Sequence, residues 1–136
     1  MRKFITLAVL ACCAAGVTQC AKTITFPVSV LVPAAQAKAQ ISLDKNGNTQ
    51  IDLKVNYLAP PQNLTPPKAT YILWLQTPDN QIVGLGQLTV GSDRKGEVKG
   101  VTQLKEFRLF VTAEDDPAAA SPGQQVILTT GFFTVG

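Results

Sequence analysis

The chain has 136 residues, and its 12 Lys or Arg against 9 Asp or Glu give a formal net charge of +3. It contains no histidine, which excludes Ser-His-Asp and Cys-His catalysis and the usual zinc, copper and haem sites. Without Arg2 and Lys3, which precede the first apolar segment, 10 basic and 9 acidic residues remain. The body of the chain therefore lacks the basic surface that a nucleic-acid partner requires, and we expect no such partner.

Residues 1–20 have the pattern of a secretory signal peptide. Arg2 and Lys3 form a positive start, residues 4–17 are almost entirely apolar, and small residues occupy positions 14–16. This apolar stretch is shorter than the roughly 20 residues that a membrane-spanning helix needs. We therefore expect an exported protein, located in the periplasm or associated with the cell envelope.

All three cysteines, Cys12, Cys13 and Cys20, lie in this segment, so the rest of the chain forms no internal disulfide. The four residues that end at Cys20 resemble the lipobox of bacterial lipoproteins, with Gln19 where a small residue is usual. We predict lipidation of Cys20, which would tether the protein to the membrane by acyl chains. Two alternatives stay open: a lipobox that ends at Cys12, after a very short apolar region, and ordinary cleavage after Gly16, which leaves Cys20 as a free thiol.

From Lys22 onward, short apolar runs alternate with Gly, Pro, Asn and Asp, which is typical of many short strands. Residues 23–32 form the first predicted strand. Pro27 inside it favours an edge position, because proline cannot donate a hydrogen bond to a neighbouring strand. We expect residues 21–36 to be a linker with an edge strand, and residues 37–136 to form one β-sandwich domain.

Residues 40–57 give the clearest local signal. Apolar and polar residues alternate on both sides of a turn at residues 44–48, whose Asn-Gly pair accepts a positive φ at little cost. This pattern predicts a half-buried antiparallel hairpin. The turn also resembles the start of a calcium loop, but Thr49 and Val55 stand where an EF-hand needs Gly and Glu, so we favour the hairpin.

Four prolines lie within residues 59–68, which therefore form neither a helix nor a central strand. We predict a stiff connection from one sheet to the other. Residues 71–75 are apolar on both faces, which predicts a central, covered strand. In the next strand, Gly84 and Gly86 indicate that a bulky side chain such as Trp74 packs over them, or that a bulge lies there.

The remaining chain predicts a short exposed strand at residues 97–101, a strand apolar on both faces at 106–113, and a final strand at 126–135. The total is about seven or eight strands at spacings typical of a sandwich. We therefore predict an all-β fold, an immunoglobulin-like antiparallel β-sandwich.

A family pattern is spread over the second half of the chain. The matching residues are Tyr71, Trp74, Leu75, Gly86, Gly96, Thr112, Glu114, Pro122 and Gly123. From Ala69 to the C-terminus, the chain resembles the extracytoplasmic C-terminal domain of anti-sigma-K factors and related small bacterial exported proteins. The resemblance implies a β-sandwich outside the membrane. It does not imply sigma-factor binding, because the sequence shows neither the sigma-binding domain nor the transmembrane helix of that family.

Two loops are the candidate interaction surfaces, and an edge strand is a third possibility. The residues that we select in these loops are Pro60, Pro61, Pro66, Pro67, Glu114, Asp115 and Asp116. The three acidic residues could hold a cation with loop carbonyls, but a run of this kind is more often a solvated loop. We expect no cofactor.

The predicted function is that of a non-enzymatic interaction or structural module of the bacterial envelope, whose partner is an envelope protein. The alternative is a carbohydrate- or cell-wall-binding module, which needs an exposed aromatic platform. Four aromatic residues could form one, but their strands are apolar on both faces, which favours core packing: Tyr71, Trp74, Phe107 and Phe110. An enzyme is disfavoured, because no base is visible that would activate a nucleophile.

Overall fold

A computed structural model describes residues 21–136. The predicted signal peptide and Cys20 lie outside the described residues. The described part of the chain contains nine strands and one short 3-10 helix, η1. Their bounds are β1 Lys22–Thr25, β2 Gln36–Leu43, β3 Thr49–Asn56, η1 Pro61–Asn63, β4 Thr70–Gln76, β5 Ile82–Val90, β6 Gly96–Thr102, β7 Glu106–Glu114, β8 Val126–Thr129 and β9 Phe133–Thr134.

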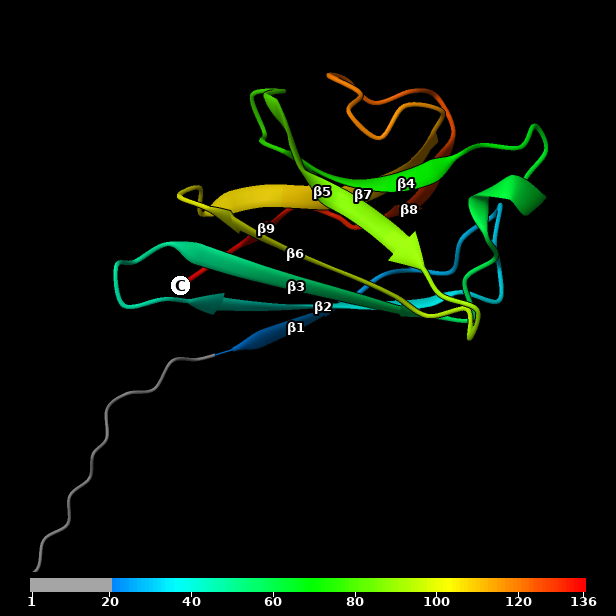
Figure 1. The fold of residues 1–136 in the computed structure, drawn as a ribbon. Coiled ribbons are helices and arrows are strands. Elements are labelled where there is room, and N and C mark those ends of the chain that lie inside the picture. Colours follow the sequence, from blue (N-terminus) through cyan, green and yellow to red (C-terminus); the bar gives the residue numbers. More distant parts are fainter. Residues whose placement is uncertain (1–20) are drawn as a thin grey trace, which may run out of the picture.

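All strand pairs are antiparallel, and the strands follow the order β1-β2-β3-β6-β5-β4-β7-β8, with β9 paired to β7. Figure 1 shows two facing layers, one of β1, β2, β3 and β6 and the other of β4, β7 and β8. Strand β5 joins them, because residues 82–88 pair with β4 whereas Thr89 and Val90 pair with β6. The two layers are thus halves of one curled sheet.

The predicted all-β antiparallel fold is confirmed. Strand β3 pairs with β6, β4 pairs with β7, and β7 pairs with β8. The same neighbours are the B–E, C–F and F–G pairs of an immunoglobulin-like sandwich. The proline-rich connection crosses from β3 in one layer to β4 in the other, as its composition predicts (Figure 1).

The hairpin of β2 and β3 is also confirmed, with Ile41 paired to Ile51 on the buried face. In its turn, Oδ1 of Asp44 accepts hydrogen bonds from the backbone amides of Asn46 at 2.8 Å and Asn48 at 2.9 Å. The bond from Asn48 is the main reason that the pKa of Asp44 is lowered. Gly47 takes a positive φ of 79°, the backbone conformation that its Asn-Gly position predicts.

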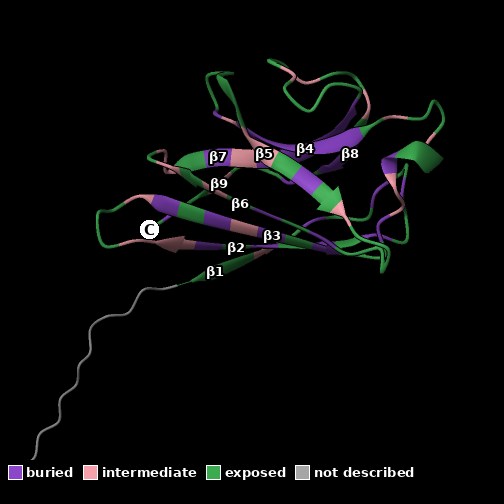
Figure 2. Cartoon of the chain, in the orientation of Figure 1, coloured by how far each residue is buried: buried purple, intermediate pink, exposed green. Residues whose placement is uncertain are grey.

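Apolar side chains from both layers pack into one core cluster. Figure 2 shows buried positions on the strands of both layers. The fully buried members of this core include Leu53 from one layer and Leu73 and Leu109 from the other. Removing such a side chain from water contributes about 1.5–3 kcal/mol. A smaller cluster of Ile72, Trp74 and Phe110 lies separately, and Ala119 packs against it. Because Ala119 belongs to the loop after β7, this loop covers the second face of β4, and β4 is buried on both faces as predicted.

The prediction that Trp74 packs over the glycines of β5 is correct for Gly84 and wrong for Gly86, and the predicted bulge is present. The Cζ3 atom of Trp74 lies 3.3 Å from the position that a Cβ on Gly84 would take. The register between β4 and β5 shifts between Leu73 and Trp74, which marks a bulge. A Cβ on Gly86 would meet Val98 at 2.9 Å, so this glycine admits the neighbouring strand β6.

Two predicted strands are shorter in the structure. Strand β1 is an edge strand as predicted, but it ends at Thr25, before Phe26 and Pro27. The predicted final strand is divided into β8 and β9, with Gly131 between them. Within residues 21–136, no helix is long and apolar enough to cross a membrane.

Candidate functional site

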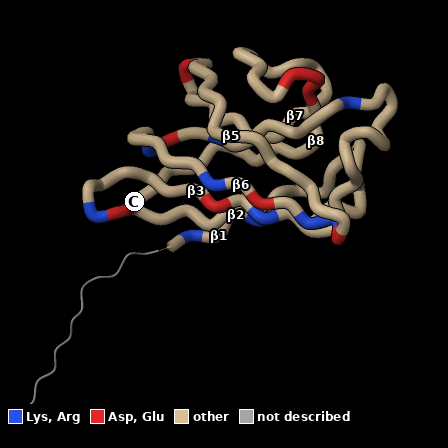
Figure 3. The backbone as a smooth tube through the Cα atoms, in the orientation of Figure 1, with Lys and Arg blue, Asp and Glu red and all other residues tan. Residues whose placement is uncertain are grey.

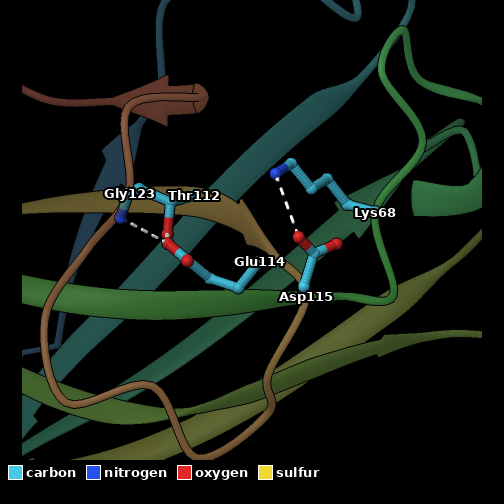
Figure 4. Close-up of polar contacts among 5 residues, drawn as sticks. All are labelled: Lys68, Thr112, Glu114, Asp115 and Gly123. Atoms are coloured by element: carbon cyan, nitrogen blue, oxygen red, sulfur yellow. Dashed lines mark hydrogen bonds and ion pairs between the residues drawn. The ribbon is translucent and has the colours of Figure 1, made fainter.

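The two loops selected from the sequence lie beside each other, although about 50 residues separate them in the chain. The Nζ atom of Lys68 forms an ion pair with Oδ2 of Asp115 at 3.4 Å (Figure 4). The backbone amide of Ala69 also donates to the carbonyl oxygen of Glu114 at 3.0 Å. These contacts join the end of the proline-rich connection to the start of the loop after β7.

A groove of about 530 Å³ opens between the two loops. Thr65, Pro66 and Lys68 line it from the proline-rich connection. Glu114, Gly123, Gln124 and Gln125 line it from the other side, and Leu31 and Ala113 complete its surface. The groove therefore offers one cation, one carboxylate, two amides and a small apolar area.

The prediction that Glu114 belongs to a solvated acidic loop is wrong. Glu114 is the last residue of β7 and only 9% exposed. Its Oε2 atom accepts a hydrogen bond from Oγ1 of Thr112 at 2.5 Å and another from the amide of Gly123 at 2.7 Å. These donors replace the water that a buried carboxylate loses, so the acidic residue tolerates its position in the strand. Asp115 and Asp116 are exposed, as predicted.

The hydrogen bonds of Glu114 continue into the core. The Nε1 atom of Trp74 donates to Oγ1 of Thr112 at 2.7 Å, and Thr112 in turn donates to Glu114. A continuous path thus runs from Trp74 on β4 through Thr112 and Glu114 on β7 to Gly123 in the following loop. We call these four residues the Trp–Thr–Glu–Gly network. Figure 4 shows Thr112, Glu114 and Gly123 converging beside the Lys68–Asp115 pair.

Tyr71 fixes the proline-rich connection in a similar way. Its hydroxyl donates to the carbonyl oxygen of Ala59 at 2.6 Å, and its ring is fully buried. Loss of water around the hydroxyl raises the pKa of Tyr71 to about 12. Tyr71, Trp74, Thr112, Glu114 and Gly123 are all among the residues on which the predicted resemblance rests. Together they attach both loops to the sheet.

The selected prolines have different environments. Pro61 is buried at the start of η1, and Pro60 is half-buried beside it. Pro66 and Pro67 are exposed, and Pro66 lines the groove. The outer part of the connection is therefore the part that is available to a partner.

Lys68 ends the first candidate loop, residues 60–68, but is not among the residues selected in it, and Gln124 and Gln125 lie just beyond the second, residues 114–123. The signal for Lys68 was present, since a cation ends the proline-rich segment and a second candidate loop is acidic. Nothing in the local sequence marks Gln124 and Gln125, because only the path of the loop back to β8 brings them to the groove.

The four aromatic residues considered for a sugar platform are at most 5% exposed. They form parts of the two apolar clusters, so they offer no stacking surface. Among residues 21–136, no three side chains of the metal-binding types lie close enough together to hold a metal ion.

Neither a model of a known protein family nor a curated protein matches this chain. The resemblance to the anti-sigma-K C-terminal domain therefore stays a prediction that rests on the residues quoted for it.

Proposed function

We propose that the protein is a non-enzymatic interaction module of the bacterial envelope, exported by its signal segment and anchored through Cys20. Its binding site is the groove between the proline-rich connection and the loop after β7. One observation carries this proposal: two loops distant in sequence lie side by side around an open groove, and each is fixed to the sheet by a partly buried hydrogen bond. A prearranged surface of this kind loses little conformational entropy when a partner binds.

The composition of the groove favours a protein partner. Lys68 and Glu114 supply opposite charges, and Gln124 and Gln125 supply amides that both donate and accept hydrogen bonds. The backbone of an extended peptide also donates and accepts, so it matches the glutamine side chains. The resemblance to an extracytoplasmic domain supports the same assignment, since a domain outside the cytoplasm is accessible to other envelope proteins.

The groove is tested by photo-crosslinking in the producing cell. A photoreactive residue is placed at Thr65 on one wall, at Gln124 on the other, and at Asn46 in the distant hairpin turn as the control. We expect one and the same protein adduct from Thr65 and Gln124, and no such adduct from Asn46. Charge reversal by Lys68→Glu should reduce the adduct from both walls. An adduct that forms from Asn46 and from neither wall would contradict the groove assignment.

The anchor is tested separately, by intact mass and membrane fractionation of the full chain beside Cys20→Ser. A mature form that begins at Cys20 and carries acyl mass, lost in the variant, is the expected result. A form cleaved near Gly16 and free of lipid in both proteins would contradict the anchor. That outcome would leave the groove assignment intact, because the groove lies wholly within the described residues.

A further inference from the structure

The outer face of β2 and β3 brings two lysines together without an acidic partner between them. Lys38 on β2 is directly opposite Lys54 on β3. Both side chains are exposed, and neither forms an ion pair within residues 21–136. Like charges directly opposite each other in a sheet destabilise it. The sheet thus carries a charge arrangement that folding alone does not favour.

The nearest acidic residues do not neutralise this pair. On the side away from β2, Lys54 is opposite Glu97 of β6. The carboxylate of Glu97, however, contacts Lys99 at 3.9 Å. Asp52 is two residues before Lys54 and is opposite Gln40 and Lys99. Figure 3 shows basic positions over β2, β3 and β6, with acidic positions among them.

A groove of about 260 Å³ contains both lysines. Around them lie polar groups that can donate hydrogen bonds, namely the amides of Gln36, Gln40 and Asn56 and the hydroxyl of Thr23. The carboxylate of Asp52 also lines this groove, beside the neutral donors. Two ammonium groups with one carboxylate and several neutral donors around them fit an anionic group that carries hydroxyls beside it.

A second groove, of about 300 Å³, continues along the same face. It shares Gln40 and Asp52 with the first groove and extends past Ser42, Gln50 and Lys99. The Oδ1 atom of Asp52 is buried and accepts no hydrogen bond from any described residue. A buried acceptor without a donor is costly, and donors such as hydroxyl groups satisfy it. The two grooves together form what we call the lysine trough.

We propose that the lysine trough binds an acidic polysaccharide, with an acidic group of the sugar chain between Lys38 and Lys54 and sugar hydroxyls along the amides and Asp52. The two grooves share residues and follow one another along the same face, so the trough is elongated, which suits a polymer. Oδ1 of Asp52, an acceptor that no described residue satisfies, favours a polymer rich in hydroxyl donors over the phosphate backbone of nucleic acid, which only accepts hydrogen bonds. This site lies on β2, β3 and β6 and is independent of the loop groove.

The test measures binding of the full-length protein to alginate, an acidic polysaccharide, and to dextran, a neutral one. Lys38→Gln and Lys54→Gln each remove one charge from the trough, and Lys45→Gln removes the same charge from the hairpin turn. We expect binding to alginate and none to dextran, weakened about tenfold by either trough variant and unchanged by Lys45→Gln. Binding should weaken as salt increases.

Thermal unfolding distinguishes lost contacts from lost structure. Lys38→Gln removes the like-charge pair without removing an opposite-charge neighbour, because Lys38 is opposite Thr25 on its other side. Its melting temperature should therefore equal or exceed that of the wild type. A fall in melting temperature that parallels the loss of binding would overturn the assignment of Lys38 as a ligand.

Three other results would overturn the proposal: no binding to alginate, an equal loss in Lys45→Gln, or binding to anionic lipid vesicles or inorganic phosphate without binding to alginate. Lys68→Glu serves as the control for the loop groove and should leave alginate binding unchanged. The two sets of variants therefore show separately whether the loop groove and the lysine trough bind their ligands.

Discussion

Thr112 is the single side chain that links the indole of Trp74 to the carboxylate of Glu114. Its Oγ1 accepts the indole hydrogen bond at 2.7 Å and donates to Oε2 of Glu114 at 2.5 Å. All three side chains are buried. The hydroxyl group of Thr112 therefore helps to fix the carboxylate that holds the loop after β7, since Glu114 accepts the hydrogen bond from the amide of Gly123 through the same oxygen atom.

Thr112→Val keeps the volume of the side chain and removes its hydroxyl. The buried indole N–H of Trp74 then loses its partner, at about 1–3 kcal/mol, and Oε2 of Glu114 loses one of its two donors. We expect the free energy of unfolding to fall by about 2–4 kcal/mol in urea denaturation. Thr89→Val, on an exposed position of β5, is the matched control and should change it by less than about 0.5 kcal/mol. Equal effects of the two substitutions would show that Thr112 is not the link described.

Gly84→Ala places a methyl group 3.3 Å from the ring of Trp74. The ring packs with Ile72 and Phe110 in the smaller apolar cluster, so it has little room to move. We expect a loss of about 1–3 kcal/mol in the free energy of unfolding, the usual cost of overpacking. Gly131→Ala is the control, because nothing lies within 4 Å of the position that its methyl group would take. A neutral Gly84→Ala would mean that Trp74 is packed less closely than the structure shows.

The ion pair of Lys68 and Asp115 should contribute little to stability. The side chain of Asp115 is 74% exposed and that of Lys68 is 24% exposed. Pairs of this kind contribute about 0.2–1 kcal/mol. A double-mutant cycle with Lys68→Ala and Asp115→Ala, followed by urea denaturation, measures the coupling directly. A coupling well above about 1 kcal/mol would mean that the pair, and not the backbone hydrogen bond from Ala69 to Glu114, is the main link between the loops.

Tyr71 gives the protein a dependence on alkaline pH. Its pKa is about 12 in the folded protein against 10.0 for the free side chain, so the folded state holds the phenolic proton more tightly. The stability that this provides is complete below pH 10 and is lost as pH rises through the folded pKa, by roughly 1–3 kcal/mol in total.

Urea denaturation over this alkaline range measures the loss, and Tyr71→Phe should remove that part of the pH dependence. The chain has two tyrosines, so Tyr71 is the one that remains in a Tyr57→Phe background. Tyrosinate absorbance of that variant then measures the ionisation of Tyr71 alone. A midpoint near pH 10 in the folded protein, the ordinary value for the free side chain, would contradict the buried, hydrogen-bonded hydroxyl.

Much of the fold could be predicted from local patterns. The alternation around Asp44 sets the register of the first hairpin, and Trp74 with Gly84 marks the crowded face of β4. The register of this hairpin already places Lys38 opposite Lys54. A polar residue at every second position, however, indicates only a strand face that is exposed to solvent. The division of β5 between β4 and β6 could not be predicted from the sequence. The pairing of β5 depends on the curl of the whole sheet and not on the residues of β5 alone.

Glu114 shows why the candidate site was harder to predict. Three adjacent acidic residues look alike in a sequence, and the average behaviour of such a run is exposure. The first of them continues the strand, and a hydroxyl on β7 and a glycine amide nine residues later offset the cost of its burial. Such compensation comes from residues that only the folded chain brings together.

The central claim is that the Trp–Thr–Glu–Gly network holds the loop after β7 at the groove. Amide hydrogen exchange of Gly123, followed by NMR, tests it most directly, because Gly123 is exposed and yet its amide is bonded to Glu114. We expect this amide to exchange far more slowly than that of exposed Ala120 in the same loop, and to lose this protection in Thr112→Val. Equally fast exchange of Gly123 and Ala120 in the wild type would contradict the account.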